Sequence, residues 1–460
     1  MAFQDLRQFL ARLEDIPGEL VHIHRPVAPQ YEAAAVLGFH REGGPTVILE
    51  NVRGYPGWRV VGNVLGTRRR VALALGLAEE EVNTGYFRRK STGLPPVTVN
   101  AAPVKEVVIT REIDLTALLP VLTYHEGDAG PYLTAGVCLA YDKASGRYHL
   151  GIHRLQVKGP DRLGILLANP PLATHFAAAE ARGAPLELAI AVGVDPALLL
   201  AAVSRAAGGP DKLAIAGALR GEPVPLVRAE TLELMVPATA EIVIEARTIP
   251  GVREREGPFG ESTGYYFAFE SPVLEVTAVT HRTQPLYQAI VPAGPEGENI
   301  LSLCSASDLQ HYLGELVEGF CGFAFVPGTY CFHAVLCLKK KNKAAARRAA
   351  LLALALDPRL KQVVVVDDDV DFTSSADVAW AVATRCQPDR DVVVLRDLPA
   401  YVIDPSAVQG MTAKVIIDAT KPPAIAERFV RIKPPPAARA LAERIWREEA
   451  GGRGLRCASS

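Results

Sequence analysis

The sequence predicts a mixed α/β protein built from three domains. Helix and strand patterns alternate over the first hundred residues, short β-rich runs between Gly and Pro turns fill the middle, and helices and strands alternate again after about residue 300. The chain has 460 residues, more than one hydrophobic core usually organises. We therefore predict a small N-terminal α/β domain over 1–100, a β-rich sheet or barrel domain over 101–298, and a C-terminal α/β domain over 299–460.

The N-terminal domain begins with an amphipathic helix and a strand. Apolar residues at the helical spacing i, i+3, i+4, i+7 are Leu6, Phe9, Leu10 and Leu13. Pro17 and Gly18 end the helix, and a strand is expected over 20–27. His22 and His24 lie on one face of that strand, where a solvated surface is expected more often than a metal site.

Apolar runs and helical spacing also predict the strands and helices of the middle and C-terminal regions. The runs VKEVVIT, LTAGVCLAY, EIVIEA and VLEVTAVT read as strands of a sheet or barrel. Further on, LQHYLGELVEGF and AAARRAALLALAL read as helices, CFHAVLCLKK as a strand, and VVVVDD as a central parallel strand covered on both faces. The basic stretch KKKNKAAARR fits a strand end and a solvated helix face better than a phosphate or nucleic-acid patch.

Composition excludes several classes of function. Lys and Arg (49) nearly balance Asp and Glu (51), so nucleic acid is not an expected partner. No apolar run approaches the roughly 18 residues of a membrane span and no signal segment opens the chain, so we expect a cytoplasmic protein with no membrane partner. The seven cysteines include no CxxC pair and are expected to be reduced thiols. The chain also lacks a GxGxxG motif after a strand and a GxxxxGK[ST] motif.

The segment EGPFGE places two carboxylates, Glu256 and Glu261, on either side of a Gly-Pro pair. A turn there brings the two acids together, and two carboxylates that share a small site have pKa values pushed apart. One of them then holds a proton at neutral pH and can act as a proton donor. The alternative is an ordinary exposed turn with two solvated acids.

Arg154 ends the segment HLGIHR, after a turn expected at 143–146, and a guanidinium there can bind a carboxylate through two hydrogen bonds. Together with Glu256 and Glu261 it suits a decarboxylase: Arg to hold the substrate carboxylate, Glu to protonate carbon. Loss of carbon dioxide from an aromatic or vinylic acid leaves charge on an sp2 carbon, and side chains offer no electron sink. A cofactor is therefore required.

Six segments, in order along the chain, resemble the UbiD family. They are REGGPTVILENVRGYP (41–56), GIHR (151–154), VPATAEIVIE (236–245), EGPFGESTGYY (256–266), VVDDDV with VAWAVATR (365–370 and 378–385), and MTAKVIIDATK (411–421). The family includes polyprenyl hydroxybenzoate decarboxylase and ferulic acid decarboxylase, which work with prenylated FMN. The resemblance implies a central split β-barrel flavin-binding domain, a C-terminal oligomerisation domain with an active-site tail, a homodimer or homohexamer, and a flavin prenyltransferase as supplier of the cofactor.

The resemblance also assigns roles to individual residues. Arg154, Glu256 and Glu261 match the catalytic Glu-Arg-Glu set, with Arg154 and Glu256 as the ion pair beside the flavin and Glu261 as the proton donor. The implied cofactor-binding residues are Thr134, Ile152, His153, Arg154, His175, Lys212 and Lys414. Among these, Thr134, Ile152 and His153 would line the isoalloxazine, and Lys414 would bind the flavin phosphate.

The implied metal site departs from the family pattern. Members hold a divalent metal, with a potassium ion nearby, between the flavin phosphate and an Asn, a His and a Glu. His175 matches the His, but His149 replaces the Asn and Lys212 replaces the Glu, while Asp211 would serve only after a one-residue shift. Two hypotheses follow: His149 and His175 bind Mn2+ together with the phosphate, or the Lys212 ammonium supplies the positive charge and the metal is weak or absent.

The substrate is expected to be an aromatic, heteroaromatic or α,β-unsaturated acid, with reversible release of carbon dioxide. The segments 289–297 (AIVPAGPEG) and 401–404 (YVID), expected to face it, carry small or aliphatic side chains and few positive groups, which favours a compact aromatic or heteroaromatic monoacid. Two other interpretations remain: a non-catalytic flavin-binding subunit of a complex, and a plain FMN-dependent oxidoreductase.

Overall fold

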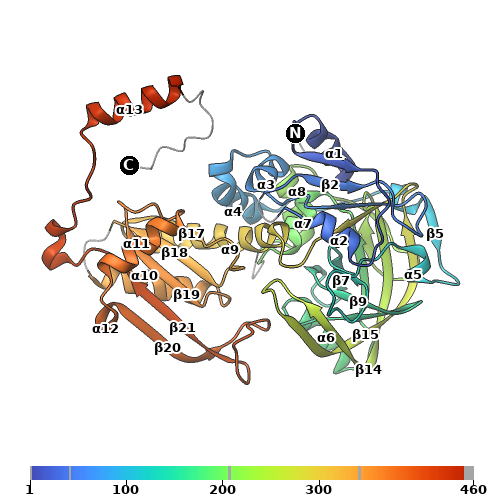
Figure 1. The fold of residues 1–460 in the computed structure, drawn as a ribbon. Coiled ribbons are helices and arrows are strands. Elements are labelled where there is room, and N and C mark those ends of the chain that lie inside the picture. Colours follow the sequence, from blue (N-terminus) through green and yellow to red (C-terminus); the bar gives the residue numbers. More distant parts are fainter. Residues whose placement is uncertain (1–2, 41–42, 206–208, 340–342, 450–460) are drawn as a thin grey trace. The chain divides into compact units, whose positions relative to one another are not determined.

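The computed structural model describes residues 3–40, 43–205, 209–339 and 343–449, and the chain divides into two units (Figure 1). The first unit comprises Met1–Asp308 together with Val402–Ser406, and the second comprises Leu309–Tyr401 and Ala407–Ser460. The predicted division into three domains at 100/101 and 298/299 stays a prediction. The described part of the chain contains no helix that is both long and apolar enough to span a bilayer.

A four-stranded sheet lies in the N-terminal part of the first unit. Its order is β1 (Leu20–Ile23), β2 (Thr46–Leu49), β3 (Arg59–Gly62) and β16 (Leu286–Ala289). The predicted first helix is confirmed as α1 (Leu6–Glu14), whose four apolar residues are all buried. The predicted strand over 20–27 is shorter in the structure and ends at Ile23. His22 on this strand contacts Glu14 and Glu50, with nitrogen–oxygen distances of 2.8 and 2.6 Å.

Short helices and a small sheet complete this part of the unit. The helices are α2 (Glu32–Leu37), α3 (Arg68–Leu75), η1 (Glu79–Glu81), α4 (Val82–Thr92), η2 (Pro103–Lys105), α7 (Pro196–Ala202) and α8 (Lys212–Arg220). The small sheet has the order β13 (Met235–Pro237), β12 (Pro225–Arg228) and β4 (Val97–Thr98). All seven residues of α7 are buried, and its apolar side chains belong to the same hydrophobic core as those of α1 and α8.

The β-rich middle region is confirmed as a nine-stranded sheet (Figure 1). Its strands are β5 (Val107–Ile109), β6 (Tyr132–Leu133), β7 (Val137–Asp142), β8 (Arg147–Ile152), β9 (Leu155–Gly159), β10 (Arg162–Ile165), β11 (Glu187–Val192), β14 (Ile242–Gly260) and β15 (Tyr266–His281). The order is β6-β9-β10-β15-β14-β11-β7-β8, with β5 on β15, and all of these neighbouring strands pair antiparallel. Two short helices, α5 (Leu115–Leu118) and α6 (Leu172–Glu180), lie between its strands in sequence.

Both faces of the central sheet are covered. Ala189 and Ala191 of β11 belong to one hydrophobic core, while Leu188 and Ile190 of the same strand belong to another. Because neighbouring side chains of a strand point to opposite faces, the sheet separates two packed layers. This explains why β11, with the sequence ELAIAV, is almost continuously apolar.

The second unit contains a five-stranded sheet of order β17-β18-β19-β21-β20 (Figure 1). The strands are β17 (Phe320–Phe325), β18 (His333–Leu338), β19 (Gln362–Asp367), β20 (Val392–Pro399) and β21 (Met411–Asp418), and the helices are α9 (Pro295–Leu316), which begins in the first unit, α10 (Lys343–Leu356), α11 (Ser375–Arg385), α12 (Pro388–Asp391), η3 (Pro423–Arg428) and α13 (Pro436–Glu449). β19 pairs in parallel with β18 and β21, which confirms the predicted central parallel strand.

The remaining C-terminal predictions are confirmed where the structure describes them. β18 and α10 lie on the predicted strand and helix segments, whereas α9 begins at Pro295, 14 residues before the predicted helix segment 309–320, and ends at Leu316. Residues 340–342 of the basic stretch lie outside the described residues. The mixed α+β fold class is therefore confirmed.

Candidate active site

Arg154, Glu256 and Glu261, predicted as a catalytic set, meet in the central sheet. The Arg154 Nη1 donates to Glu261 Oε1 at 2.6 Å, and its Nε donates to Glu256 Oε2 at 3.2 Å, with a further bond from Nη2 to the same Glu256 oxygen. Arg154 lies between β8 and β9, Glu256 on β14, and Glu261 directly after β14. One guanidinium thus bridges two carboxylates that are 107 and 102 residues away in the chain.

The predicted turn between the two glutamates is wrong. β14 continues to Gly260 and stays paired with β15, with a shift of register between Glu256 and Phe259. Glu256 lies opposite Phe269 and Phe259 lies opposite Phe267, so three steps on β14 match two on β15. This is a β-bulge, which absorbs one residue of the strand.

The bulge explains why both acids reach the same arginine. In a regular strand, residues 256 and 261 would point to opposite faces, because their separation is odd. The extra residue in the bulge restores Glu256 to the face that carries Phe259 and, two residues later, Glu261. The Gly257 N–H is satisfied by the side chain of Gln156, at 3.2 Å.

Aromatic rings and burial complete the surroundings of the guanidinium. The Arg154 Cζ lies 5.1 Å from the centre of the Phe259 ring and 5.3 Å from that of Phe269. The exposed fraction of the side chain is 6% for Arg154, 0% for Glu256 and 15% for Glu261. Glu261 is therefore the acid that solvent or a ligand reaches.

Burial and charge shift the pKa values within the cluster. Burial raises the pKa of Glu256, and the Glu261 carboxylate adds to the effect, while the hydrogen bonds and charge of Arg154 oppose it. Burial alone would lower the pKa of Arg154, but the hydrogen bonds and charges of Glu256 and Glu261 outweigh it and raise the pKa. Arg154 is therefore a permanent cation.

Tyr132, which the sequence did not single out, lies beside this cluster. Its ring centre is 4.2 Å from that of Phe259, and the side chain is fully buried on β6. Burial and the neighbouring Glu256 carboxylate raise the pKa of the phenol, so it stays protonated. Its hydroxyl and Glu256 Oε1 are buried polar atoms without a hydrogen bond of standard geometry among the described residues. No sequence pattern distinguishes this tyrosine from a core aromatic.

The residues predicted to line a flavin ring lie at the ends of strands next to Arg154: Thr134 follows β6, and His153 follows β8. The Thr134 hydroxyl accepts the Ile290 N–H at 3.1 Å and shares a 2.6 Å hydrogen bond with Tyr124. His153 is buried, which lowers its pKa to about 4, and its Nδ1 lies 2.9 Å from the Leu166 carbonyl. The imidazole is therefore neutral, with Nδ1–H as the donor. Ile152, the last residue of β8, is half-buried.

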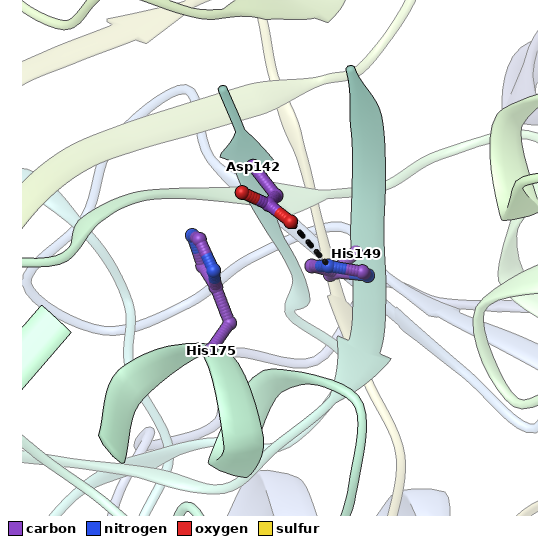
Figure 2. A group of neighbouring side chains, drawn as sticks. All are labelled: Asp142, His149 and His175. Carbon is purple, nitrogen blue, oxygen red and sulfur yellow. Dashed lines mark ion pairs between the residues drawn. The ribbon is translucent and has the colours of Figure 1, made fainter. Parts of the chain in front are cut away.

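A second cluster brings His149 and His175 together with Asp142 (Figure 2). His149 lies on β8, Asp142 at the end of β7, and His175 on α6. Each residue offers a ligand atom within 4.8 Å of the others, and the ring centres of the two histidines are 5.3 Å apart. The prediction that the two histidines are neighbours is thus confirmed. Asp142 was missed, because only the pairing of β7 with β8 brings it close.

The cluster lines a cavity of about 780 Å3. Lys143 and Arg182 also line it, as do Glu187 and Glu233. Burial, and next the neighbouring His175, lowers the pKa of His149, so its imidazole is neutral at pH 7. A neutral imidazole has the lone pair that a metal ion requires.

Lys212 and Asp211, which are adjacent in the chain, are not part of the cluster of Asp142, His149 and His175. The Lys212 Nζ donates to the carbonyl oxygens of Leu150 and Ala202, both at 2.7 Å, and burial lowers its pKa to about 8. Asp211 is the N-cap of α8, where its Oδ1 accepts the Ala214 N–H at 2.9 Å. Both side chains therefore have structural partners.

Lys414 belongs to the second unit. It lies on β21, and its Nζ donates to the Pro358 carbonyl at 2.9 Å. Burial lowers its pKa. Its role at a flavin phosphate stays a prediction.

Comparisons with known proteins agree with this geometry. Models of the 3-octaprenyl-4-hydroxybenzoate carboxy-lyase family match along the chain: the N-terminal domain over 11–89, the Rift-related domain over 96–295 and the C-terminal domain over 307–419. The chain is 33% identical to anhydromevalonate phosphate decarboxylase of Methanothermobacter thermautotrophicus, covering 93% of this chain and 99% of that one. It is also 33% identical to phenolic acid decarboxylase of Bacillus subtilis, covering 92% and 93%.

Solved structures share the fold over almost the whole chain. The UbiD-class enzyme HmfF of Pelotomaculum thermopropionicum, in complex with FMN, aligns with a TM-score of 0.90 and 41% identity, covering 95% of this chain and 99% of that one. An evolved dimeric form of that enzyme in complex with prFMN aligns with a TM-score of 0.86 and 41% identity, covering 95% and 98%. The chain described here therefore belongs to the UbiD family of decarboxylases.

Proposed function

We propose that this chain is a prenylated-FMN-dependent decarboxylase of a compact aromatic or heteroaromatic monoacid. The observation that carries the proposal is the Glu256–Arg154–Glu261 cluster, in which one buried guanidinium bridges a buried and a more exposed carboxylate. The names of similar proteins support the same reaction class, since they include a phenolic acid decarboxylase and a UbiD-class enzyme in complex with prFMN.

The two acids have different roles because they bind Arg154 differently. Glu256 is fully buried and accepts two hydrogen bonds from the guanidinium, so it fixes the position of Arg154. Glu261 holds Arg154 through Nη1 and is the more exposed partner. A substrate carboxylate that binds to this side of the guanidinium competes with Glu261 and frees it.

Carbon dioxide then leaves when the bond between the substrate carbon and its carboxylate breaks. The prenylated flavin, when bound, supplies the electron sink that side chains lack. Arg154 orients the carboxylate that departs. Glu261, once released from Arg154, takes up a proton from solvent and gives it to the carbon that lost carbon dioxide, which returns Glu261 to the carboxylate form. Because each step can run backwards, a high concentration of bicarbonate should drive carboxylation.

The residues present fit a flavin that carries a phosphate. Going from His149 to Arg154 along the chain takes five residue steps, which span at most about 17 Å in an extended strand. His149 lines the 780 Å3 cavity, and Arg154 contacts Glu256 and Glu261. Ile152 and His153 lie between them, and Thr134 lies near, which suits a ring held between the cavity and Arg154. We place the phosphate at His149 and His175 with Mn2+, and a potassium ion nearby.

The substrate class rests on the segments 289–297 and 401–404. Residues 402–406, which include most of the second segment, belong to the same unit as Arg154. Ile403 and Asp404 are buried. The side chains of both segments are mostly small or aliphatic, with no lysine or arginine in them. A second carboxylate or a phosphate on the substrate would therefore lack a cationic partner in these segments.

The experiment is a screen for release of carbon dioxide by protein co-expressed with a flavin prenyltransferase and purified without oxygen. Aromatic and heteroaromatic monoacids are compared with the dicarboxylic acid of the same ring. We expect turnover of a monoacid, with kcat/KM for the matched diacid at least tenfold lower, and loss of turnover in Arg154→Gln. Holoenzyme with bound prenylated flavin that releases no carbon dioxide from any acid would reject the proposal.

We also propose that the protein is a homodimer or homohexamer that associates through its C-terminal region. Helix α13 has no buried residue, and the exposed fractions of Leu441, Ile445 and Trp446 are 46%, 43% and 58%. Two of these residues are four positions apart and so share one face of the helix. An apolar face of this kind is typical of a contact with a second copy of the chain.

A further inference from the structure

We propose that Asp142 is the carboxylate ligand of a divalent metal centre that it forms with His149 and His175. The inference rests on the proposed function, because it describes the cation that would bind the flavin phosphate. It goes further in the ligand set: a carboxylate from β7 takes the place of the glutamate that Lys212 has replaced. The centre then has one carboxylate and two imidazoles.

The hairpin of β7 and β8 brings two of the three ligands together. His149 lies opposite Ala140, and Asp142 lies opposite Arg147, so Asp142 and His149 are diagonal neighbours. Residues 140 and 142 share a face of β7, and 147 and 149 share a face of β8, so both ligands point to one side of the sheet. Figure 2 shows the third, His175, reaching them from α6.

The separations suit one ion. Metal–ligand bonds of about 2.1 Å place donor atoms about 3–4.3 Å apart around an ion. The three ligand atoms lie within 4.8 Å of one another, and the pair His149 Nε2 and Asp142 Oδ2 is 3.9 Å apart (Figure 2). A shift of side chains by a few tenths of an ångström brings them onto one cation. The 3.9 Å pair is an ion-pair contact that is too long for a hydrogen bond, so a cation between the two atoms would displace no hydrogen bond.

Two hydrogen bonds in the hairpin turn fix the Asp142 carboxylate and leave lone pairs on its oxygens for a metal ion. Its Oδ1 accepts the Ala144 N–H at 2.9 Å, and its Oδ2 accepts the Ser145 hydroxyl at 2.6 Å. Each carboxylate oxygen has a second lone pair, so the group can bind a cation while both turn bonds persist. The turn therefore orients the ligand in advance, as supporting hydrogen bonds commonly do at metal sites.

Lys212 and Asp211, the other residues considered for the predicted metal site, lie outside the cluster of ligand atoms. The Lys212 ammonium donates to two backbone carbonyls at 2.7 Å. The Asp211 carboxylate caps α8 through the Ala214 N–H. Among the described residues, the carboxylate that forms a cluster of ligand atoms with the two histidines is that of Asp142.

The cavity leaves room for further ligands. Three protein ligands leave about three positions of a six-coordinate Mn2+ ion for water or phosphate oxygens. The cluster lines the 780 Å3 cavity, which is also lined by Arg182, Glu187 and the ion pair of Lys143 with Glu233. The bound cation itself, with Arg182 at the same cavity, favours a ligand that brings negative charge, such as a phosphate monoester.

The test is a titration of flavin-free, EDTA-stripped protein with Mn2+ alone, with free Mn2+ measured by electron paramagnetic resonance. We expect one site per chain, with Kd at least tenfold higher in Asp142→Asn and in His175→Gln. Two matched controls should bind within twofold of wild type: Glu233→Gln, which removes another carboxylate lining the same cavity, and Asp211→Asn, which keeps the helix cap. Thermal unfolding in EDTA checks that every variant is folded.

Unchanged Mn2+ affinity in Asp142→Asn, weaker binding in Asp211→Asn, or no Mn2+ site in the wild type would overturn the inference. The proposed function is tested separately, by the mass of the flavin released from holoenzyme. If the holoenzyme releases prenylated flavin but Asp142→Asn leaves the Mn2+ affinity unchanged, the ligand assignment is rejected and the proposed function is kept. The reverse result, with the expected Mn2+ pattern and no prenylated flavin, would keep the ligand assignment and reject the function.

Discussion

At the scale of single residues, the difference between Glu256 and Glu261 is their access to ligands. Both contact Arg154, but Glu256 is fully buried, whereas Glu261 keeps 15% of its side chain exposed. Replacing Glu261 with Gln keeps a similar shape and removes the acid. We expect kcat to fall about 10²–10⁴-fold, as for loss of a general acid, while bound flavin stays at one per chain.

A suitable control for this substitution is Glu270→Gln, an exposed glutamate on β15. Turnover and flavin content should match those of the wild type. Activity of Glu261→Gln above a tenth of the parent rate would contradict the role of Glu261 as proton donor.

The buried His153 makes the stability of the protein depend on pH. Its pKa in the folded state is about 4, below the value of about 6.5 for an exposed histidine, because burial disfavours the charged ring. Between pH 6.5 and 4 the unfolded chain binds more protons at this residue, so folding stability falls as pH falls through that window. The full effect is about 3 kcal/mol.

We expect His153→Gln to remove this part of the loss. Chemical denaturation at pH 7 and at pH 4.5 should show a smaller drop in unfolding free energy for the variant than for the wild type. The exposed His24 serves as the control, since His24→Gln should keep the wild-type drop. An identical drop in His153→Gln would contradict the neutral, buried state of this ring.

Two acids five positions apart and an arginine after a strand made Arg154, Glu256 and Glu261 candidates, and the resemblance of the surrounding segments to the UbiD family selected them as the catalytic set. Tyr132 and Asp142 were missed for a physical reason. Tyr132 reaches its site through the pairing of β6 with β9, which no local pattern reports. Asp142 and His149 meet in the hairpin of β7 and β8, and although a turn was expected at 143–146, the register of that hairpin was not predicted.

At the scale of elements, β14 shows where local reasoning failed. Gly and Pro between two polar residues usually indicate a turn. Here the neighbouring strand β15 supplies a partner on both sides of the Gly-Pro pair, so the ladder continues and the pair becomes a bulge. The proximity of the two acids was predicted correctly, but the bulge and their shared arginine cause it.

Gly151, on strand β8, lies between His149 and His153, and the structure leaves no space for a side chain there. A Cβ added at Gly151 would lie 2.6 Å from the His153 Nε2 and 3.3 Å from a Leu172 methyl carbon. His153 is buried and held by its bond to Leu166, so it has little room to move. We expect Gly151→Ala to lower the unfolding free energy by about 1–3 kcal/mol and to reduce flavin content.

The matched control for this prediction is Gly159→Ala, at the end of β9. The nearest atom to its added Cβ is 3.9 Å away, which is an ordinary contact. Urea denaturation of both variants checks the difference. Equal stability of Gly151→Ala and the wild type would mean that His153 is not confined as the structure indicates.

At the scale of the whole molecule, the apolar face of α13 predicts how copies associate. Leu441 and Ile445 are exposed on one face, and a charge on each would oppose burial against a second copy. We expect the double variant Leu441→Glu with Ile445→Glu to have a lower molar mass in light scattering than the wild type. Arg447→Glu, on the same helix, is the control for added negative charge. A wild-type mass for the double variant would contradict association through α13.

The fold class followed from alternation of helix and strand patterns, which local sequence records well. Long-range pairings did not follow. β16 joins the N-terminal sheet beside β3, and β4 joins β12, although more than a hundred residues separate the partners in each case. Such pairings are chosen by packing across the whole unit, so a single sequence does not reveal them.

The central claim is that this chain performs decarboxylation with a prenylated flavin at the Arg154 cluster. The most direct measurement is the mass and absorption spectrum of the cofactor released from protein co-expressed with a flavin prenyltransferase and purified without oxygen. The account predicts prenylated FMN, bound at about one per chain and kept in Glu261→Gln. Release of ordinary FMN alone, or of no flavin, would contradict the account and favour a plain FMN-dependent oxidoreductase or a non-catalytic subunit.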